Sequence, residues 1–177
     1  MKTENYSKGS LATRVLAFAV LIAILAVMSC KDDDNNNDTT NMAPYTISGN
    51  ASGSQAVPVV PGNGAGTISG SYDPSTRVLN YTTTWTGLSG RPISGGFYAG
   101  APGTVDSTSA LVGSRWTFDS TATATGTLTG KLTLTPDQQT ALSAGSWFYS
   151  FATKAHPTGE VRGQITATQA PTGTTQN

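Results

Sequence analysis

The sequence has little of the chemistry on which most enzyme active sites depend. Its 177 residues include one cysteine and one histidine, and 11% of them are charged, against about 25% in an average soluble protein. A single cysteine excludes an internal disulfide, and a single histidine excludes the multi-histidine sites typical of zinc and copper proteins. From residue 45 onward no Lys/Arg cluster occurs, which excludes the basic footprint of a nucleic-acid-binding protein.

Small polar residues are abundant in the sequence and take the place of charged residues. Thr, Ser and Asn form helices poorly, whereas Thr and the aromatic residues favour pleated, half-buried surfaces. The 20 glycines and 9 prolines supply turns between many short strands. Without residues 1–29, seven basic residues stand against nine acidic ones, a net charge of −2. The composition therefore predicts an all-β, mildly acidic protein.

The N-terminal region resembles a lipoprotein signal peptide over residues 1–29. Arg14 precedes fourteen apolar residues, 15–28, which suits the hydrophobic region of a signal peptide and is shorter than the roughly 18 to 20 residues that span a bilayer. The run ends in "VMSC", similar to a lipobox although Met28 is bulkier than usual there. We expect Cys30 to carry two acyl chains, which anchor a protein to a membrane where one would not. An uncleaved membrane anchor is the alternative.

Composition divides the rest of the chain into a tether, one domain and a tail. Residues 30–44 contain "KDDDNNNDTTN", an acidic and polar run with nothing to bury, which reads as a solvated tether. It also resembles the surface-export signal of some Gram-negative lipoproteins, although a plain spacer would look the same. Residues 45–168 suffice for one domain, and residues 169–177 form a disordered tail rich in Pro, Gly and Thr. We expect an extracytoplasmic location at the outer membrane or cell surface.

Turn residues and alternating side chains predict a hairpin early in the domain. Residues 73–76, Asp-Pro-Ser-Thr, fit a turn. In the following run, 79–85, Leu, Tyr, Thr and Trp alternate with Asn and Thr, which is the period of a strand with one inward face. The similar pieces "GTISG" at 66–70 and "GTLTG" at 126–130 suggest two related halves.

A capping box predicts one short helix near residues 136–144. Thr135 occupies the N-cap position, Pro follows at the first helical position, and Gln138 can reach back to the Thr135 amide. Gly145 ends the helix after about two turns. The aromatic residues at 147, 149 and 151 then alternate as another strand.

The segment "AHPTGEVRGQI", 155–165, holds the most suggestive polar cluster. His156 could act as a general base oriented by Glu160, but no nucleophile stands at an identifiable spacing from it. Pro157 and Gly159 are turn residues between two β-patterned runs, so we interpret the segment as a structural hairpin. Glu160 and Arg162 lie two residues apart on one face, where we expect them to pair over the surface of the sheet. We assign no catalytic or metal-binding residue.

Several stretches resemble the CHRD domain, first described in chordin and common in exported bacterial proteins. They are, in order, "SGNASGSQAVPVV", "GTISG", "LNYTTTWTGLSG" and "LTPDQQTALSAGSWFYSFATKAHPTGEVRGQI", and they span about residues 45–168. The resemblance implies an immunoglobulin-like or Greek-key β-sandwich or barrel without established enzymatic activity. Family members usually carry His-x-His where this chain has Gly96-Phe97-Tyr98, and another histidine where it has Ala152. His156 stands where asparagine is usual, so a metal-dependent role is doubtful here.

These features favour a lipid-anchored β-domain of the cell envelope or surface with a binding or structural role and no catalysis. Its partners would be the membrane, through lipidated Cys30, and an unknown protein or glycan ligand, with no nucleic acid and no cofactor. The alternative is a carbohydrate-binding module with Trp85, Trp116 or Trp147 as exposed platforms, although large aromatics more often fill a core. A metal-dependent protein resembling oxidoreductases is the remote alternative.

Overall fold

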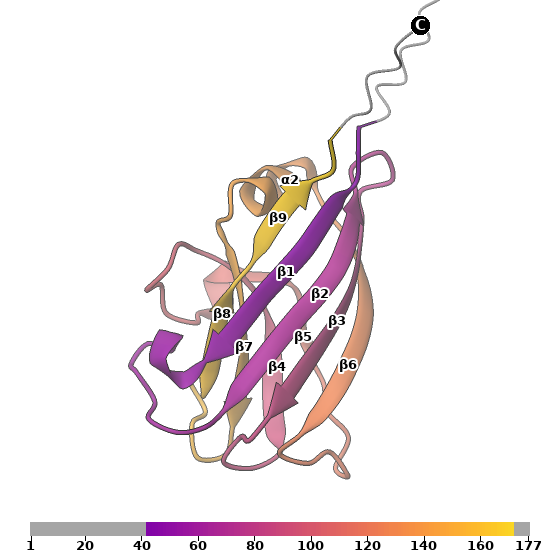
Figure 1. The fold of residues 1–177 in the computed structure, drawn as a ribbon. Coiled ribbons are helices and arrows are strands. Elements are labelled where there is room, and N and C mark those ends of the chain that lie inside the picture. The colour runs from indigo at the N-terminus through magenta and orange to yellow at the C-terminus, as the bar shows by residue number, and fades with distance from the viewer. Residues whose placement is uncertain (1–41, 172–177) are drawn as a thin grey trace, which may run out of the picture. The chain divides into compact units, whose positions relative to one another are not determined.

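The computed structural model describes residues 42–171, and these fold into nine strands, one α-helix and two short 3-10 helices. The signal peptide, Cys30 and most of the predicted tether and tail lie outside the described residues. The strands are β1 (Tyr45–Ser52), β2 (Ala65–Asp73), β3 (Val78–Thr86), β4 (Pro92–Ala99), β5 (Leu111–Trp116), β6 (Gly126–Thr133), β7 (Trp147–Thr153), β8 (Val161–Gln164) and β9 (Thr166–Gln169). The helices are η1 (Gly53–Gln55), η2 (Thr108–Ala110) and α2 (Pro136–Ser143) (Figure 1).

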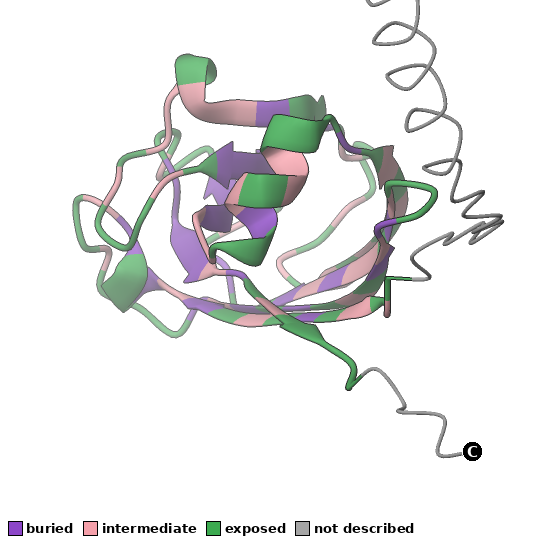
Figure 2. Ribbon diagram, turned by 90° about the horizontal axis from the view of Figure 1, so that it is seen from above, coloured by how far each residue is buried: buried purple, intermediate pink, exposed green. Residues whose placement is uncertain are grey.

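The strands form a single antiparallel sheet that curls into a nearly closed barrel (Figure 2). Its order is β5-β4-β7-β8-β1-β2-β3-β6, and β9 pairs with the first half of β1. A cavity of about 350 Å³ lies between the two end strands, β5 and β6. The prediction of an all-β fold with one short helix is confirmed. No helix within residues 42–171 is long and apolar enough to cross a membrane.

Aromatic side chains fill the interior of the barrel. The exposed fractions of Trp85, Trp116 and Trp147 are 4%, 7% and 0%. Phe97 lies among them, with its ring centre 5.0 Å from that of Trp116 and 5.8 Å from that of Trp147. Edge-to-face and tilted pairs of this kind add to the stabilisation that burial provides. The prediction that the tryptophans fill the core is therefore confirmed. The alternative prediction, that they are exposed and form platforms for carbohydrate, is wrong.

Local sequence signals explain the β2–β3 hairpin and the helix. The Asp73 carboxylate accepts hydrogen bonds from the Ser75 amide at 2.9 Å and the Thr76 hydroxyl at 2.9 Å, which fixes the turn. At the start of α2 both bonds of the capping box are present, Gln138 N–H to Thr135 Oγ1 and Thr135 N–H to Gln138 Oε1. Because these contacts join near neighbours in sequence, the turn and the capping box were correctly predicted.

The two similar pentapeptides lie on either side of β3. Residues 66–70 belong to β2 and residues 126–130 to β6, and in both the two glycines pair with Trp85 and Tyr81 of β3. A Cβ atom on Gly126 would overlap the Trp85 ring, and one on Gly130 would overlap the Tyr81 ring. The spacing of the two glycines in β6 thus follows from the room that these rings require, whereas a Cβ atom on Gly70 of β2 would overlap the Asn80 carbonyl oxygen.

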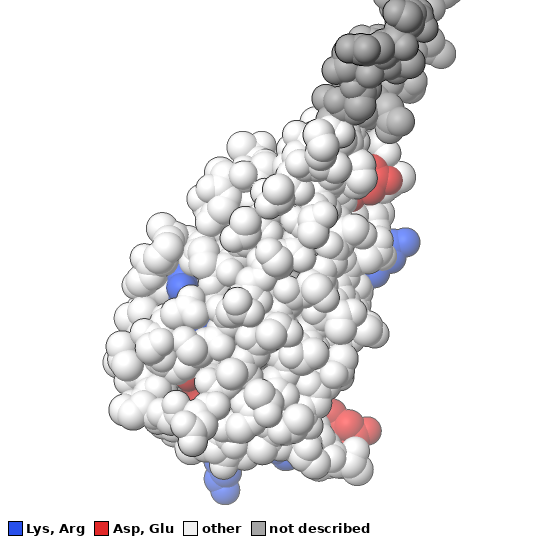
Figure 3. Space-filling view, in the orientation of Figure 1, with Lys and Arg blue, Asp and Glu red and all other residues white. Residues whose placement is uncertain are grey.

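The outer face of β9, β1, β2 and β3 is polar and nearly uncharged (Figure 3). Its side chains are Thr, Ser and Asn in register across the strands, as at Asn50, Thr67 and Thr84. The Thr67 and Thr84 hydroxyls lie 2.7 Å apart and share a hydrogen bond. This surface accounts for the low charge of the chain.

Strand β7 differs from the others because all seven of its residues are buried. Trp147, Tyr149 and Phe151 belong to the core of the barrel. Phe148, Ser150 and Ala152 point to the outside, where the segment 100–110 and the β7–β8 hairpin cover them. The strand is therefore central on both faces, and its outer face forms the floor of the candidate site.

Candidate functional site

The predicted structural hairpin lies between β7 and β8. His156 N–H donates to the Thr153 carbonyl oxygen at 3.1 Å, and Gly159 N–H donates to the His156 carbonyl oxygen at 3.2 Å, around Pro157. Gly159 has a φ of 120°, which disfavours a side chain. Glu160 follows the turn directly, and its N–H donates to Phe151 O at 2.8 Å. The turn residues thus aim the Glu160 side chain at the loop that follows β3.

Glu160 is a buried carboxylate with structural partners. Its exposed fraction is 5%. Oε1 accepts the Ser89 N–H at 2.6 Å, and Oε2 accepts the hydroxyls of Ser89 and Thr153, each at 2.5 Å. Burial alone would raise the pKa of Glu160, but these hydrogen bonds together lower it below its ordinary value. The carboxylate joins the β7–β8 hairpin to the 87–91 loop.

Arg162 is buried on the outer face of β8, with an exposed fraction of 2%. Its Nη2 donates to the Ala101 carbonyl oxygen at 2.8 Å and to Gln164 Oε1 at 3.2 Å. The guanidinium carbon lies 3.8 Å from the centre of the Phe148 ring, a cation–π contact, and Tyr98 stacks with that ring at 5.2 Å.

The expected surface pair between Glu160 and Arg162 is wrong. Each side chain has other partners, and neither is exposed. The cause is the segment 100–110, which crosses the outer face of β7 and β8 and offers the Ala101 carbonyl to Arg162. Glu160, one residue before β8, instead reaches the 87–91 loop. Residues that share a face by alternation need not share surroundings.

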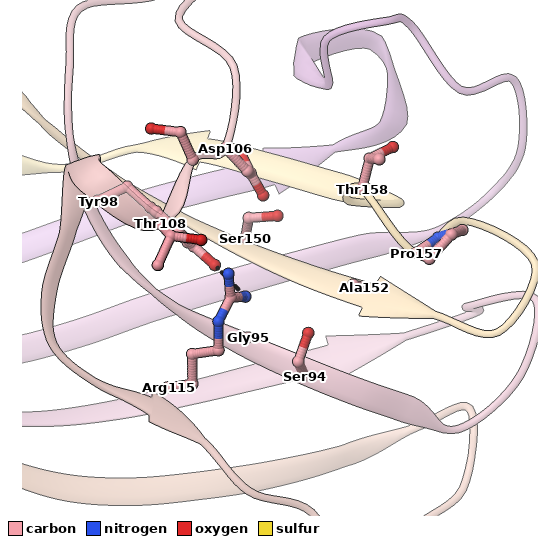
Figure 4. Close-up of a pocket in the computed structure, with 11 residues that line it drawn as sticks. Ser94, Gly95, Tyr98, Asp106, Thr108, Arg115, Ser150, Ala152, Pro157 and Thr158 are labelled. Carbon is pink, nitrogen blue, oxygen red and sulfur yellow. Dashed lines mark hydrogen bonds between the residues drawn. The ribbon is translucent and has the colours of Figure 1, made fainter.

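Beside Arg162, a polar pocket of about 230 Å³ opens over the outer faces of β4 and β7 (Figure 4). Strand β5 and the segment before η2 provide two further walls, and the tip of the β7–β8 hairpin provides another. The lining residues are Ser94, Gly95, Tyr98, Asp106, Ser107, Thr108, Arg115, Ser150, Ala152, Pro157 and Thr158. Four segments distant in sequence therefore meet at this pocket.

The pocket holds one acidic and one basic side chain. Burial raises the pKa of the Asp106 carboxyl, while the nearby Ser150 hydroxyl and the positive charges of Arg162 and Arg115 act against that rise. Arg115 Nη1 donates to the Tyr98 hydroxyl at 3.1 Å, which orients the guanidinium. Both side chains reach the pocket, Asp106 from the covering segment and Arg115 from β5 (Figure 4).

Two polar atoms at or beside this pocket have no hydrogen-bond partner. The Ser150 hydroxyl is 1% exposed and no well-aligned hydrogen bond holds it, although it lies near Asp106. The Arg162 Nε is also buried without a partner. Most buried polar groups in folded proteins are hydrogen-bonded. Both atoms are shielded from solvent, and the Ser150 hydroxyl lies beneath the floor of the pocket beside Asp106.

The ligand types that suit metals are sparse in the described domain. Within residues 42–171, no three His, Cys, Asp or Glu side chains are grouped closely enough to hold a metal ion. Asp106 is the one carboxylate that lines the pocket, and His156 is not among the lining residues. The arrangement offers hydrogen bonds and charge.

Comparison with known protein families assigns the described domain to one of them. The model of the CHRD domain matches residues 47–165, from β1 to the residue after β8. The chain belongs to the CHRD domain family. No curated protein and no solved structure matches it.

The positions where the CHRD resemblance led us to expect histidines lie on the outer faces of β4 and β7. Tyr98 and Ala152 line the pocket, and Gly96 pairs with Ser150 across the two strands. Sequence reasoning named these positions but not Asp106, Arg115 and Ser150 as a group. One signal was present in the sequence: the outward positions of β7 are Phe, Ser and Ala, which indicates a strand covered on both faces.

Proposed function

We propose that the chain is a lipid-anchored domain of the cell envelope or surface that acts by binding or as a structural component, without catalysis. The anchor is supported by the apolar run at 15–28 and by "VMSC" before Cys30. The acidic run after Cys30 favours display on the outer membrane or cell surface. These segments lie outside the described residues.

The partners of the buried charges carry the non-catalytic part of the proposal. Glu160, the carboxylate nearest to His156 in sequence, accepts three hydrogen bonds from Ser89 and Thr153. Structural donors occupy three of its roughly four lone-pair positions, so it is poorly placed to orient a base or accept a proton from a substrate. A binding role is supported by the polar pocket, where Asp106 and Arg115 bring opposite charges to a lining rich in hydroxyls.

We also propose that the barrel has Greek-key connectivity. Strands β4 and β5 are neighbours at one end of the sheet, whereas β6 returns to lie beside β3 at the other end. If the cavity between β5 and β6 is counted as a closed seam, the order β4-β5-β6-β3 is that of a Greek key. An immunoglobulin-like arrangement, with two separate sheets, is less well supported by the single curled sheet.

Metabolic labelling tests the anchor. We expect the full chain, produced in a Gram-negative host with labelled palmitate, to incorporate the label and to fractionate with membranes. Cys30→Ala removes the acceptor thiol, so label and membrane association are lost. Ser29→Ala keeps a small residue before the cysteine and serves as the matched control, with labelling unchanged. Normal processing and membrane association of Cys30→Ala would contradict the proposal.

A further inference from the structure

The polar pocket over β4 and β7 contains groups that suit a ligand with many hydroxyls. When it is ionised, the Asp106 carboxylate can only accept hydrogen bonds, whereas the Arg115 guanidinium can only donate them. Hydroxyls of Ser94, Thr108 and Thr158 can both donate and accept. Tyr98 adds a further hydroxyl, and burial raises its pKa, so this group stays protonated at neutral pH. A polyol, whose hydroxyls also donate and accept, complements such a mixed set.

The charges in the pocket argue against a simple ion as the ligand. An anion attracted by Arg115 would meet the Asp106 carboxylate, and a cation attracted by Asp106 would meet Arg115, with the buried Arg162 also close to Asp106. Opposite charges on two walls with hydroxyls between them favour a neutral polar molecule. A zwitterion would satisfy the charges, but it would use few of the hydroxyls that line the pocket.

The size and the apolar part of the pocket narrow the class further. Its volume, about 230 Å³, is below the roughly 300 to 1,000 Å³ of pockets that hold drug-sized ligands, so it suits one small ring. Ala152 and Pro157 give the lining a small apolar patch beside the hydroxyls. A sugar ring has both a C–H face and a rim of hydroxyls, and it matches both parts.

The pocket also carries a cost to folding that a ligand would offset. The Ser150 hydroxyl is buried without an aligned partner, and the Asp106 carboxylate beside it is partly withdrawn from water, which raises its pKa. Unpaired buried polar groups destabilise a fold. Binding sites commonly keep such groups at the expense of stability.

Taking the proposed binding role as its basis, we propose that this pocket binds a single sugar unit, at the end or on a branch of a glycan, through Asp106 and Arg115. Asp106 accepts hydrogen bonds from two sugar hydroxyls, and Arg115 donates to another. Binding is non-covalent, and no bond of the sugar is broken.

Binding assays on the full chain test this proposal. The chain is purified in a zwitterionic detergent, because glycoside detergents would compete for the site. It is then applied to a glycan array and titrated calorimetrically with glucose, galactose, mannose, fucose, rhamnose and N-acetylglucosamine. Glycine, alanine and inorganic phosphate serve as probes for the zwitterion and anion classes. We expect at least one saccharide to bind and these three probes not to bind.

Four variants locate the binding. Asp106→Asn and Ala152→Leu, which respectively remove the charge and fill the floor, are expected to weaken saccharide binding about tenfold or more, equivalent to about 1.4 kcal/mol. Asp119→Asn and Thr129→Leu make the same changes at exposed positions away from the pocket, and we expect them to leave affinity unchanged. Thermal unfolding of each variant verifies that it folds.

Three results would overturn the proposal. They are the absence of saccharide binding to the wild-type chain, saccharide binding that persists in both folded pocket variants, and binding of glycine, alanine or phosphate in place of sugars. Palmitate labelling of Cys30 is independent of all three. Failure of the sugar site with normal labelling therefore leaves the anchored-domain proposal standing, whereas loss of labelling alone contradicts only the anchor.

Discussion

Glu160 provides the sharpest test of how the hairpin is held to the rest of the barrel. In Glu160→Ala the Thr153 hydroxyl, which is 0% exposed, loses its carboxylate acceptor, and an unsatisfied buried group costs about 1–3 kcal/mol. The Ser89 hydroxyl, 3.0 Å away, is a weaker substitute acceptor. Ser89 itself is exposed, so its N–H and O–H regain water and add about 1 kcal/mol. We expect a total loss of about 3 kcal/mol in the free energy of unfolding.

Urea unfolding at neutral pH measures this loss, with the fluorescence of the buried tryptophans as the signal. The chain is prepared without residues 1–29, and Lys154→Ala, an exposed change next to Thr153, is the control within about 0.5 kcal/mol of wild type. In a double-mutant cycle, Glu160→Gln and Thr153→Val should be coupled by about 0.5 kcal/mol or more. A loss below about 1 kcal/mol for Glu160→Ala, in the range of exposed pairs, would refute the reasoning.

The same carboxylate gives the fold an acid-sensitive contribution. Because the pKa of Glu160 in the folded chain is below its ordinary value of 4.5, its contribution is present above that value. It is lost as the pH falls through the folded-state pKa. The difference between wild type and Glu160→Ala should therefore shrink in acid, and a difference that is independent of pH would contradict this assignment.

Three further changes test other parts of the structure. Because the pKa of Asp106 is raised, the contribution of this carboxyl to the free energy of unfolding is complete below its ordinary pKa of 3.8 and is lost as pH rises through the folded-state pKa. Asp106→Asn should therefore be more stable than wild type at neutral pH and lose this advantage in acid, which urea unfolding at both pH values measures. Gly126→Ala brings a methyl group against the Trp85 ring and should cost about 1–3 kcal/mol by overpacking; an unchanged melting temperature would contradict the close approach. Thr135→Ala removes the N-cap hydroxyl that accepts the Gln138 N–H and should lower the free energy of unfolding by about 1 kcal/mol in urea unfolding; an unchanged value would contradict a stabilising role for the capping box.

Features that depend on neighbouring residues could be read from the sequence. The turn at residues 73–76, the alternation of β3 and the boundaries of α2 each follow from side chains within a few positions of one another. The alternation along β3 also identified its inward residues, since Leu79 and Thr83 are both 0% exposed. Burial of the tryptophans followed from their size alone.

Long-range contacts explain what the sequence did not disclose. Strand β4 contains Gly95 and Gly96 and has no clear alternation, and its pairing with β7 joins residues about 50 positions apart. The burial of Glu160 and Arg162 depends on the 87–91 loop and the segment 100–110, which periodicity within β8 cannot reveal. The same holds for the pocket, because Asp106, Arg115 and Ser150 come from three separate segments.

The two ends of the described domain leave it side by side. Ala170 N–H donates to the Pro44 carbonyl oxygen at 3.0 Å, next to the point where the start of β1 pairs with the end of β9 (Figure 1). Domains with adjoining ends tolerate insertion into loops of other proteins. We therefore expect this barrel to tolerate insertion between two residues of a surface loop in a host protein while its strand pairing stays intact.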